Sequence, residues 1–333
     1  MAPNNGVEIE CMTHTAIMNE NSPLTLVIMA AGLGSRFGGD KQLAALGLSG
    51  ETMLELSALS AYKAGFTKLV LVIRPELENR LDSLLRERIN PLVSPEFQVC
   101  YCYQELDDLP AGALSHLDHF DHRQKPWGTA HALWCARHKV KGLMAVINAD
   151  DYYGDSAFEL LAKGLLARPQ EWMMVAYPLH LTLSEHGGVN RGVCRVDQGM
   201  LQEVVEWVDI RQQGQEVAGL CNGEPGNLNG STPVSMTCWG FSAAIFAVLE
   251  DALEQFIVEH GHEQRTECYL PMVIQHHLDS AKLNRQTENE QATGLIRVET
   301  AQEPWFGVTY PQDVAWVKTK LDELEDNKNG VVA

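Results

Sequence analysis

The chain has 333 residues, 45% of them hydrophobic, which is enough to bury one large core or two modest ones. Its 44 acidic and 25 basic residues give a formal charge of -19, and no block of the sequence is rich in Lys or Arg. Nucleic acids and anionic membranes both require a basic surface, so we expect neither as a partner. A polyphosphate ligand stays possible, because backbone amides, a few cations and a metal ion can form a local positive site.

The first 22 residues read as a mobile leader. They contain neither a basic start nor a continuous apolar stretch, so they do not predict a signal or transit peptide. No window approaches the roughly 18 apolar residues of a membrane span. The eight cysteines show no Cys-x-x-Cys pair or zinc spacing, which favours buried free thiols. We expect a cytoplasmic protein.

Short apolar runs alternate with amphipathic segments from Leu24 onward, as in sheets whose parallel strands are linked by helices. The runs that predict strands are LTLVIMA (24–30), KLVLVI (68–73), QVCYCY (98–103), LMAVIN (143–148) and WMMVAY (172–177). Helical spacing of apolar residues occurs between them at 52–64, 76–89, 128–139 and 156–167. Strands that are apolar on both faces must be covered on both faces. We therefore expect an α/β fold, a mostly parallel open sheet in an α/β/α sandwich.

The pattern changes after about residue 178. GVCRVD (192–197) and LQEVVEWV (201–208) predict two neighbouring strands joined by a turn. The polar, Gly/Asn-rich stretch at 219–233 predicts a surface excursion. The elements expected after it are a returning strand in SMTCWGF (235–241), helices near 243–259 and 267–279, a strand region at 295–308 and a final helix opened by Pro311 and Asp313. We expect this half to cover a substrate rather than to form an independent domain.

A glycine-rich turn, AAGLGSRFGGDKQ (30–42), follows the first predicted strand. The carboxyl end of such a strand is where α/β sheets bind ligands. A dinucleotide fingerprint would need glycine where this chain has Phe37, and a P-loop would need Lys-Ser/Thr where it has Asp40, Lys41 and Gln42. Neither motif fits.

The same turn nevertheless suits a triphosphate. Its backbone amides can approach phosphate oxygens, and Ser35 adds a hydroxyl donor. The Arg36 guanidinium can grip two oxygens, while Lys41 supplies a point charge near the phosphorus under attack. The alternative is a tight turn with solvated charges.

Two further motifs lie at predicted strand ends. In NADDYYG (148–154), Asp150 and Asp151 offer carboxylate oxygens of the kind that Mg²⁺ prefers, although an Asx turn with a helix cap would use the same residues. In KPWGTAHAL (125–133), Gly128 and Thr129 open a helix whose free amides can meet a base or a phosphate. Together with the glycine-rich turn, these motifs place three polar sites at sheet edges.

With these motifs in this order, the chain resembles the sugar-1-phosphate nucleotidyltransferases, also called nucleoside-diphosphate-sugar pyrophosphorylases. The likeness covers roughly residues 24–325. The segments that carry it are AAGLGSRFGGDK, the Gln of YQELDDLP, PWGTAHA, NADDYYG, GVCRVD followed by EVVEW, VSMTCWGF, ECYLP and WFGVTYPQD. The resemblance implies a Rossmann-like fold and Mg²⁺-assisted attack of an acceptor phosphate on the α-phosphorus of a nucleoside triphosphate, without a covalent enzyme intermediate. Mn²⁺ is a possible substitute for Mg²⁺.

The resemblance also implies roles for single residues. For the nucleotide these are Ala31, Gly32, Gly34, Ser35, Arg36 and Lys41 around the triphosphate, with Gln104, Gly128 and Thr129 at the base. Asp150 would hold the metal ion, and Asp151 is a possible second ligand. For the acceptor they are Gly192, Glu206, Trp239 and Glu267. For Trp239, a core aromatic on a strand is an equally good interpretation.

The acceptor side departs from the family pattern. Many members have Glu-Lys-Pro in the second half, whereas here Glu206 is followed by Trp207 and Val208, so Arg191 or Arg195 would have to replace the phosphate-binding Lys. Several relatives also carry a second metal-binding Asp after a Trp near the chain end. In WFGVTY that position is not acidic.

We expect a single domain over residues 23–325. Its expected parts are a nucleotide-binding half at about 23–178, an acceptor-binding half at about 179–310 and a C-terminal helix at 311–325, followed by a tail at 326–333. The main alternatives are a cytidylyltransferase or related transferase acting on a non-sugar phosphate, and a nucleotide-sugar-binding glycosyltransferase-like protein. A glycosyltransferase would not need a triphosphate pocket with Arg36 and Lys41. The sequence leaves the base, the sugar and the oligomeric state open.

Overall fold

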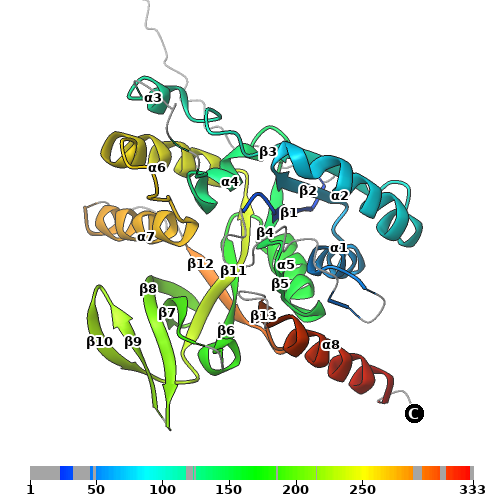
Figure 1. The fold of residues 1–333 in the computed structure, drawn as a ribbon. Helices are drawn as coiled ribbons and strands as arrows, with labels where there is room; N and C mark the ends of the chain where they lie inside the picture. Colours follow the sequence, from blue (N-terminus) through cyan, green and yellow to red (C-terminus); the bar gives the residue numbers. More distant parts are fainter. Residues whose placement is uncertain are drawn as a thin grey trace, which may run out of the picture.

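A computed structural model of the chain describes residues 23–32, 46–47, 50–117, 123, 125–184, 187–214, 216–287, 295–307 and 313–330, with the side chains of 284–287 and 325–330 left aside. Strands lie at the centre of the molecule and helices on their two sides (Figure 1). None of the described helices combines the length and the apolar character that crossing a membrane requires.

Four parallel strands form the first part of the sheet, in the order β3-β2-β1-β4. They are β1 (Thr25–Met29), β2 (Lys68–Ile73), β3 (Gln98–Tyr103) and β4 (Leu143–Asn148), and together with β6 (Trp172–Pro178) they confirm the five strands expected from apolar runs. Every side chain of β1 is buried. A strand covered on both faces needs apolar residues at every position, which is why continuous apolar runs identified these strands.

Helices cover both faces of this parallel part. On one face lie α1 (Met53–Lys63), α2 (Glu78–Leu84) and α5 (Asp155–Ala167), which pack with Leu26 and Ile28 of β1. On the other lie α4 (Thr129–Cys135), α6 (Ile245–His260) and α7 (Leu270–Thr287), which pack with Val27 and Met29. The alternating side chains of β1 therefore serve two separate hydrophobic cores, as in a layered α/β/α arrangement.

The expectation of a mostly parallel sheet is wrong for the rest of the molecule. Strand β11 (Pro233–Ser242) runs antiparallel between β4 and β6. It also pairs with β7 (Val189–Asp197), which pairs with β8 (Met200–Gln213). Strand β12 (Ile296–Thr300) then joins β8 to β6, so that β7, β8, β12, β6 and β11 form a closed ring. Short turns connect antiparallel strands readily, whereas parallel neighbours need long crossovers, and burial patterns alone do not reveal which neighbour a strand will take.

The stretch at 219–233 contains a hairpin that the sequence analysis missed. Strands β9 (Glu216–Cys221) and β10 (Glu224–Leu228) pair antiparallel around Asn222 and Gly223, both at positive φ. An Asn-Gly turn is a strong hairpin signal when alternating apolar residues flank it, but here the flanking residues are largely polar and the strands are not recognisable from the sequence. The hairpin extends β8 and projects from the molecule beside β7 (Figure 1).

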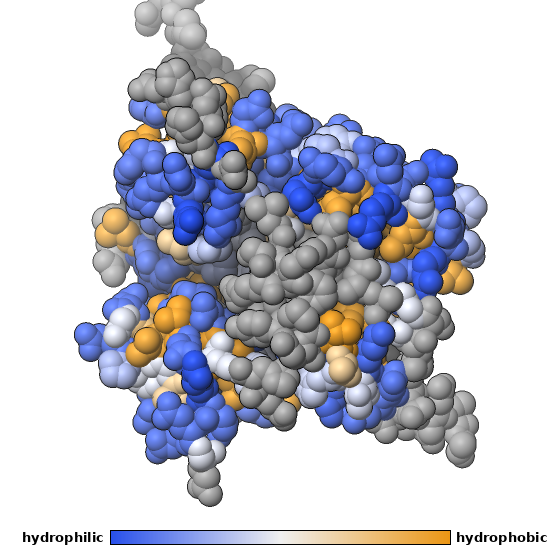
Figure 2. Space-filling view, viewed as in Figure 1, coloured by the Kyte–Doolittle hydropathy of each residue, from blue (hydrophilic) through white to orange (hydrophobic). Residues whose placement is uncertain are grey.

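The remaining α-helices and strands of the described residues are α3 (Ala111–Leu114), β5 (Asp151–Tyr152), β13 (Phe306–Gly307) and α8 (Asp313–Gly330). Short 3-10 or π-helical segments lie at Pro75–Leu77, Leu85–Ile89, Asn90–Leu92 and Leu179–Thr182. Strand β5 pairs with β13, and α8 continues past the end expected at residue 325. On the face shown in Figure 2, hydrophobic residues form small groups between hydrophilic ones.

Candidate functional site

The carboxyl ends of the four parallel strands β3, β2, β1 and β4 lie at one edge of the sheet. Met29 at the end of β1 is in register with Asn148 at the end of β4, and the Ala149 amide donates to the Met29 carbonyl. Gln104, directly after β3, donates its backbone amide to Ile73 of β2. The strand order therefore brings Gly32, Asp150 and Gln104 to the same edge, as the motifs predicted.

The glycine-rich turn begins at this edge. Ala31 is buried and Gly32 is exposed. Gly34, Ser35, Arg36 and Lys41 lie outside the described residues. Their roles stay predictions.

The two carboxylates of NADDYYG differ in their surroundings. Asp150 lies half-buried in the turn after β4, whereas Asp151 is 7% exposed in β5. One oxygen of Asp151 accepts from the Asn148 side-chain amide at 3.0 Å and lies 3.2 Å from the Tyr153 hydroxyl. Burial raises the pKa of Tyr153 well above its usual value, with the nearby Asp151 adding to the rise, so its hydroxyl stays protonated. Asp151 is thus held by protein groups, while Asp150 is the more accessible of the two.

Gly128 is required by a backbone contact. It adopts φ +106°, and a Cβ there would lie 2.5 Å from the Cys268 carbonyl oxygen. The Cys268 amide donates to the Trp127 carbonyl at 2.7 Å, and the Cys268 carbonyl accepts from the Ala130 amide at 3.1 Å. These bonds join the segment before α4 to the segment before α7 without space for a side chain at 128.

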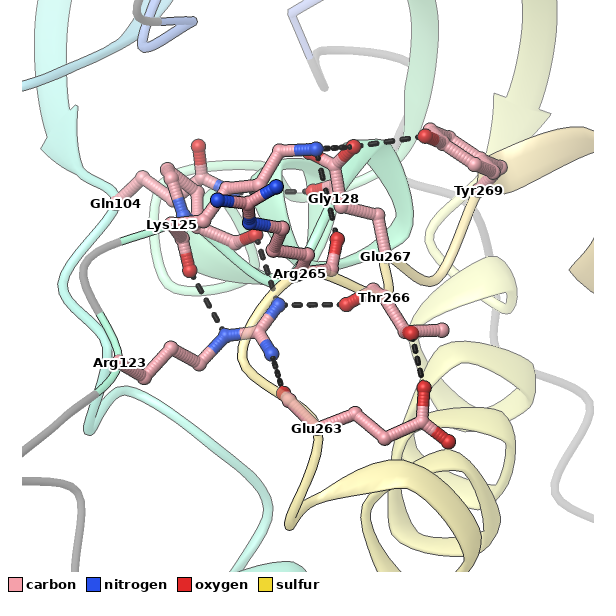
Figure 3. A network of polar contacts seen from close by, with 10 residues as sticks. Gln104, Arg123, Lys125, Gly128, Glu263, Arg265, Thr266, Glu267 and Tyr269 are labelled. Atoms are coloured by element: carbon pink, nitrogen blue, oxygen red, sulfur yellow. Dashed lines mark hydrogen bonds and ion pairs between the residues drawn. The ribbon is translucent and has the colours of Figure 1, made fainter.

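Arg123 strengthens the same junction (Figure 3). Its guanidinium donates to backbone carbonyls on both segments: those of Lys125 and Pro126 on one, and those of Glu263 and Thr266 on the other. It also stacks over the Trp127 ring, 3.6 Å from its centroid. Burial lowers the pKa of Arg123, and Glu267 and Glu263 oppose that shift. The sequence analysis did not single out Arg123.

The predicted contacts at 104, 129 and 267 already have protein partners. The Gln104 side-chain nitrogen donates to the Gly128 carbonyl at 3.0 Å, and the Thr129 hydroxyl accepts from the Leu270 amide at 2.9 Å. Glu267 pairs with Lys125 at 2.6 Å and accepts from the Tyr269 hydroxyl (Figure 3). The structure therefore brings the predicted base-binding residues and Glu267 into one polar network.

A second cluster lies on β7 and β8. Gly192 is opposite Glu206 in the register, and Arg191 is opposite Trp207. A Cβ at Gly192 would lie 3.0 Å from Val204 and 3.3 Å from Ser235, so the strands approach closely there. Glu206 is exposed; partial desolvation raises its pKa, and Arg191 opposes that rise.

Arg191 and Arg195 have different surroundings. The Arg191 guanidinium donates to Thr182 and lies 5.0 Å from the Trp305 ring centroid. Burial lowers its pKa to about 10, opposed by Asp151 and Glu206, so it stays charged at neutral pH. Arg195 is exposed and pairs with Glu203 at 3.2 Å. Arg191 interacts electrostatically with Asp151 and Glu206, one residue from each candidate cluster.

Trp239 is placed in the hydrophobic core. Its side chain is 0% exposed and stacks on Phe241 with 5.9 Å between ring centroids. This position matches the core alternative considered for Trp239. Its indole nitrogen has no hydrogen-bond partner among the described residues.

No group of three or more His, Cys, Asp or Glu side chains within the described segments is arranged to hold a metal ion. Among the hollows on the described surface, one follows β8, β9 and β10 and another lies between the start of α1 and α2. Neither is lined by a predicted site residue. A metal ion at the sheet edge would depend on one or two carboxylates and on the ligand itself, as is usual for nucleotide-bound Mg²⁺.

Comparison with known proteins gives a family match over the strands that carry the glycine-rich turn and Gln104. Residues 26–105 match the family described as MobA-like NTP transferase domain. No curated protein sequence matches the chain. The family match covers β1 to Glu105, which includes the glycine-rich turn and Gln104.

Similar solved structures cover nearly the whole chain. One is described as a glucose-1-phosphate thymidylyltransferase from Bacillus anthracis, in complex with a sucrose; it has 13% identity, a TM-score of 0.58 and coverage of 90% of this chain and 95% of its own. The UTP-bound UGPase from Acinetobacter baumannii has 15% identity, a TM-score of 0.54 and coverage of 90% and 93%. The inositol-1-phosphate CTP transferase from T. maritima has 11% identity, a TM-score of 0.55 and coverage of 91% and 97%.

At these identities the likeness establishes the fold, a mixed α/β nucleotidyltransferase fold. The expected relation to NTP transferases is confirmed by the family match over residues 26–105.

Gly128→Ala should destabilise the protein more than Gly65→Ala. Both glycines have similar φ, +106° and +99°, but an added Cβ meets nothing within 4 Å at Gly65. Gly65→Ala should therefore cost only the strained backbone, about 1 kcal/mol. Gly128→Ala must also move the Cys268 backbone and should cost about 1–3 kcal/mol more. Urea unfolding of the two variants measures the difference, and equal losses would contradict the close contact at Gly128.

Proposed function

We propose that this chain transfers a nucleotidyl group from a nucleoside triphosphate to a sugar 1-phosphate. A phosphate oxygen of the acceptor attacks the α-phosphorus, the bond from that phosphorus to the oxygen of the β-phosphate breaks, and pyrophosphate leaves with the electron pair. The observation that carries the proposal is the NTP transferase match at residues 26–105 on strands whose carboxyl ends bring Gly32, Asp150 and Gln104 to one edge. Chemistry of this kind asks a protein mainly for positioning and charge neutralisation.

The nucleotide is proposed to occupy the half at about 23–178. Backbone amides from Ala31 to Ser35 approach the phosphates, while Arg36 and Lys41 neutralise their charge. Gln104, Gly128 and Thr129 form the base site. In support of this site, Gln104 and Gly128 are bonded to one another at the expected edge.

A divalent cation fits Asp150. Its carboxylate is a hard oxygen ligand at the end of β4, and its half-buried position leaves it more accessible than Asp151. Mg²⁺, or Mn²⁺ in its place, supplies positive charge to the phosphates when bound. Asp151 is the proposed second ligand of the pair, although its contacts with Asn148 and Tyr153 favour a positioning role.

The acceptor is proposed to occupy the half at about 179–310. Glu206 is exposed opposite Gly192, which lets the neighbouring strands approach closely beneath it. Arg191 is the better replacement for the missing phosphate-binding Lys, because it interacts with both Asp151 and Glu206. Glu267 lies in the network around Gly128, and Trp239 would act only from within the core.

A second candidate acceptor is another phosphorylated alcohol. The similarity to an inositol-1-phosphate CTP transferase, with a TM-score of 0.55, favours it as the alternative. The nucleotide half is the same in both proposals, so only the acceptor separates them.

A screen for released pyrophosphate tests the proposal. It crosses UTP, dTTP, CTP, GTP and ATP with sugar 1-phosphates and with other phosphorylated alcohols. We expect turnover with at least one sugar 1-phosphate, only when Mg²⁺ or Mn²⁺ is present, and first with a pyrimidine triphosphate. Lys41→Ala is the control and should lower kcat by about 10² or more. Activity confined to phosphorylated alcohols would support the alternative acceptor instead.

Asp150→Asn should lower turnover by about 10² or more and raise the Mg²⁺ concentration needed for half-maximal rate, because the amide keeps the shape but loses the charge. Asp151→Asn should lose less. Turnover of both variants across a Mg²⁺ titration, with melting temperatures recorded alongside, measures the difference. An active Asp150→Asn beside an inactive Asp151→Asn would make Asp151 the metal ligand, and two active variants would place the metal elsewhere.

Arg191→Lys should raise the KM for the acceptor about tenfold or more and leave the KM for the triphosphate nearly unchanged. The lysine keeps the charge but loses the two-pronged guanidinium contact, and the lost binding free energy should be about that of one charge-assisted hydrogen bond. Arg195→Lys is the matched control and should change neither constant, because Arg195 is exposed and pairs with Glu203. The assignment to Arg191 is wrong if the two variants behave alike.

A further inference from the structure

A fully buried histidine lies directly behind the proposed base site. His131 is on α4, less than one helical turn after Gly128, and its side chain is 0% exposed. Its two ring nitrogens contact different partners: Nε2 lies 2.9 Å from the Asp108 carbonyl oxygen, and Nδ1 lies 3.2 Å from the Gln104 side-chain nitrogen. These contacts determine which nitrogen carries the proton.

A carbonyl oxygen can only accept, so His131 Nε2 must be the protonated nitrogen. Burial lowers the pKa of His131 to about 4, with Asp108 raising it and Arg137 and Arg123 lowering it further. The ring therefore carries one proton at neutral pH, and Nδ1 is left as an acceptor. The Cys135 thiol also faces the ring, 3.6 Å from Nε2, and burial raises its pKa so that it stays protonated.

The acceptor at Nδ1 fixes the direction of the Gln104 amide. The Gln104 nitrogen faces two acceptors, Nδ1 of His131 and the Gly128 carbonyl at 3.0 Å. A reversed amide would place its oxygen against both of them, with no proton between. Both amide protons are thus used inside the protein, and the Gln104 side-chain oxygen, which accepts from no group in the described part of the chain, is left to meet a ligand.

Asp108 holds the far end of this hydrogen-bond chain. Its carboxylate oxygens accept from the Arg137 guanidinium at 2.6 and 3.0 Å, a two-point contact that fixes their geometry. The same guanidinium lies over the Trp134 ring, 4.2 Å from its centroid. Asp108, whose backbone carbonyl contacts His131, is therefore anchored to the turn that follows α4.

We propose that His131 is a positioning residue that keeps the Gln104 side-chain oxygen directed toward the ring nitrogen of the base rather than toward its exocyclic groups, so that the site selects bases whose ring carries an N–H donor there. Uracil and thymine at N3 and guanine at N1 are such bases, whereas cytosine at N3 and adenine at N1 present acceptors. This inference rests on the proposed function, because it takes Gln104 as part of a nucleotide site. A site built around one hydrogen bond discriminates strongly against a ligand that leaves its group unpaired.

Nucleotide affinity tests the proposal without requiring turnover. Calorimetry measures the Kd of each Mg²⁺-triphosphate for the wild type, His131→Asn and His131→Leu, with His277→Leu as the control for losing a partly buried ring elsewhere. We expect the wild type to prefer UTP, dTTP or GTP over CTP and ATP. His131→Leu should reduce that preference about tenfold, the scale of one hydrogen bond. His131→Asn, whose side-chain oxygen can take the place of Nδ1, should retain it, as should His277→Leu.

Other results overturn the proposal. A wild-type preference for CTP or ATP does so, as does a His131→Leu variant that weakens all triphosphates equally, which would make His131 a packing residue only. Binding of triphosphates without transfer to any acceptor would overturn the proposed function but leave this inference standing. Absence of any triphosphate binding would overturn both.

The tautomer can be measured directly on the intact protein. Nitrogen-15 NMR of labelled histidines should show one ring, missing from His131→Asn, that keeps its proton on Nε2 and stays neutral from pH 7 to pH 5. A proton on Nδ1, or titration near the ordinary histidine pKa of about 6.5, contradicts the proposal.

Discussion

The antiparallel insertion of β11 is the constraint on which both candidate sites depend. This strand pairs with β6 along one side, and on the other side with β7 near its start and with β4 near its end, so it connects the parallel sheet to the closed ring. It carries a bulge between Ser235 and Trp239, with Thr237 at φ +58°. The Tyr153 hydroxyl lies within hydrogen-bond distance of the carbonyls of Met236 and Thr237 at this bulge, and it accepts from the Asn148 amide. The distance between the end of β4 and the ring is therefore set by packing rather than by a flexible linker.

Polar contacts then join the nucleotide side to the second half of the chain at another place. Arg123 and Gly128 bind the segment before α4 to the segment before α7, which carries Glu267. The buried chain from Asp108 through His131 to Gln104 lies behind that junction. Because buried polar groups are costly when left unpaired, such a connected network holds its members in one arrangement.

An acidic chain can bind a triphosphate only where positive groups gather locally. This chain carries a formal charge of -19, and yet a triphosphate must find positive groups in it. Several cations near the described edge already contact protein oxygens: Arg123 contacts backbone carbonyls, Lys125 pairs with Glu267, and Arg137 pairs with Asp108. The proposed phosphate contacts therefore fall to Arg36 and Lys41 of the glycine-rich turn, to backbone amides and to a bound cation.

The sequence by itself determined the buried strands, the order of the edge motifs and the relation to NTP transferases. Continuous apolar runs indicate strands that are buried on both faces. Glycines and charged residues at the ends of such strands indicate where a ligand can approach the sheet. Only the tertiary structure decided that β11 runs antiparallel, that Trp239 lies in the core, and that Asp151 and Arg191 differ in surroundings from Asp150 and Arg195. The contacts of Arg123 and His131 also appeared only there. Each depends on atoms brought together from distant parts of the chain, and local periodicity carries no information about such contacts.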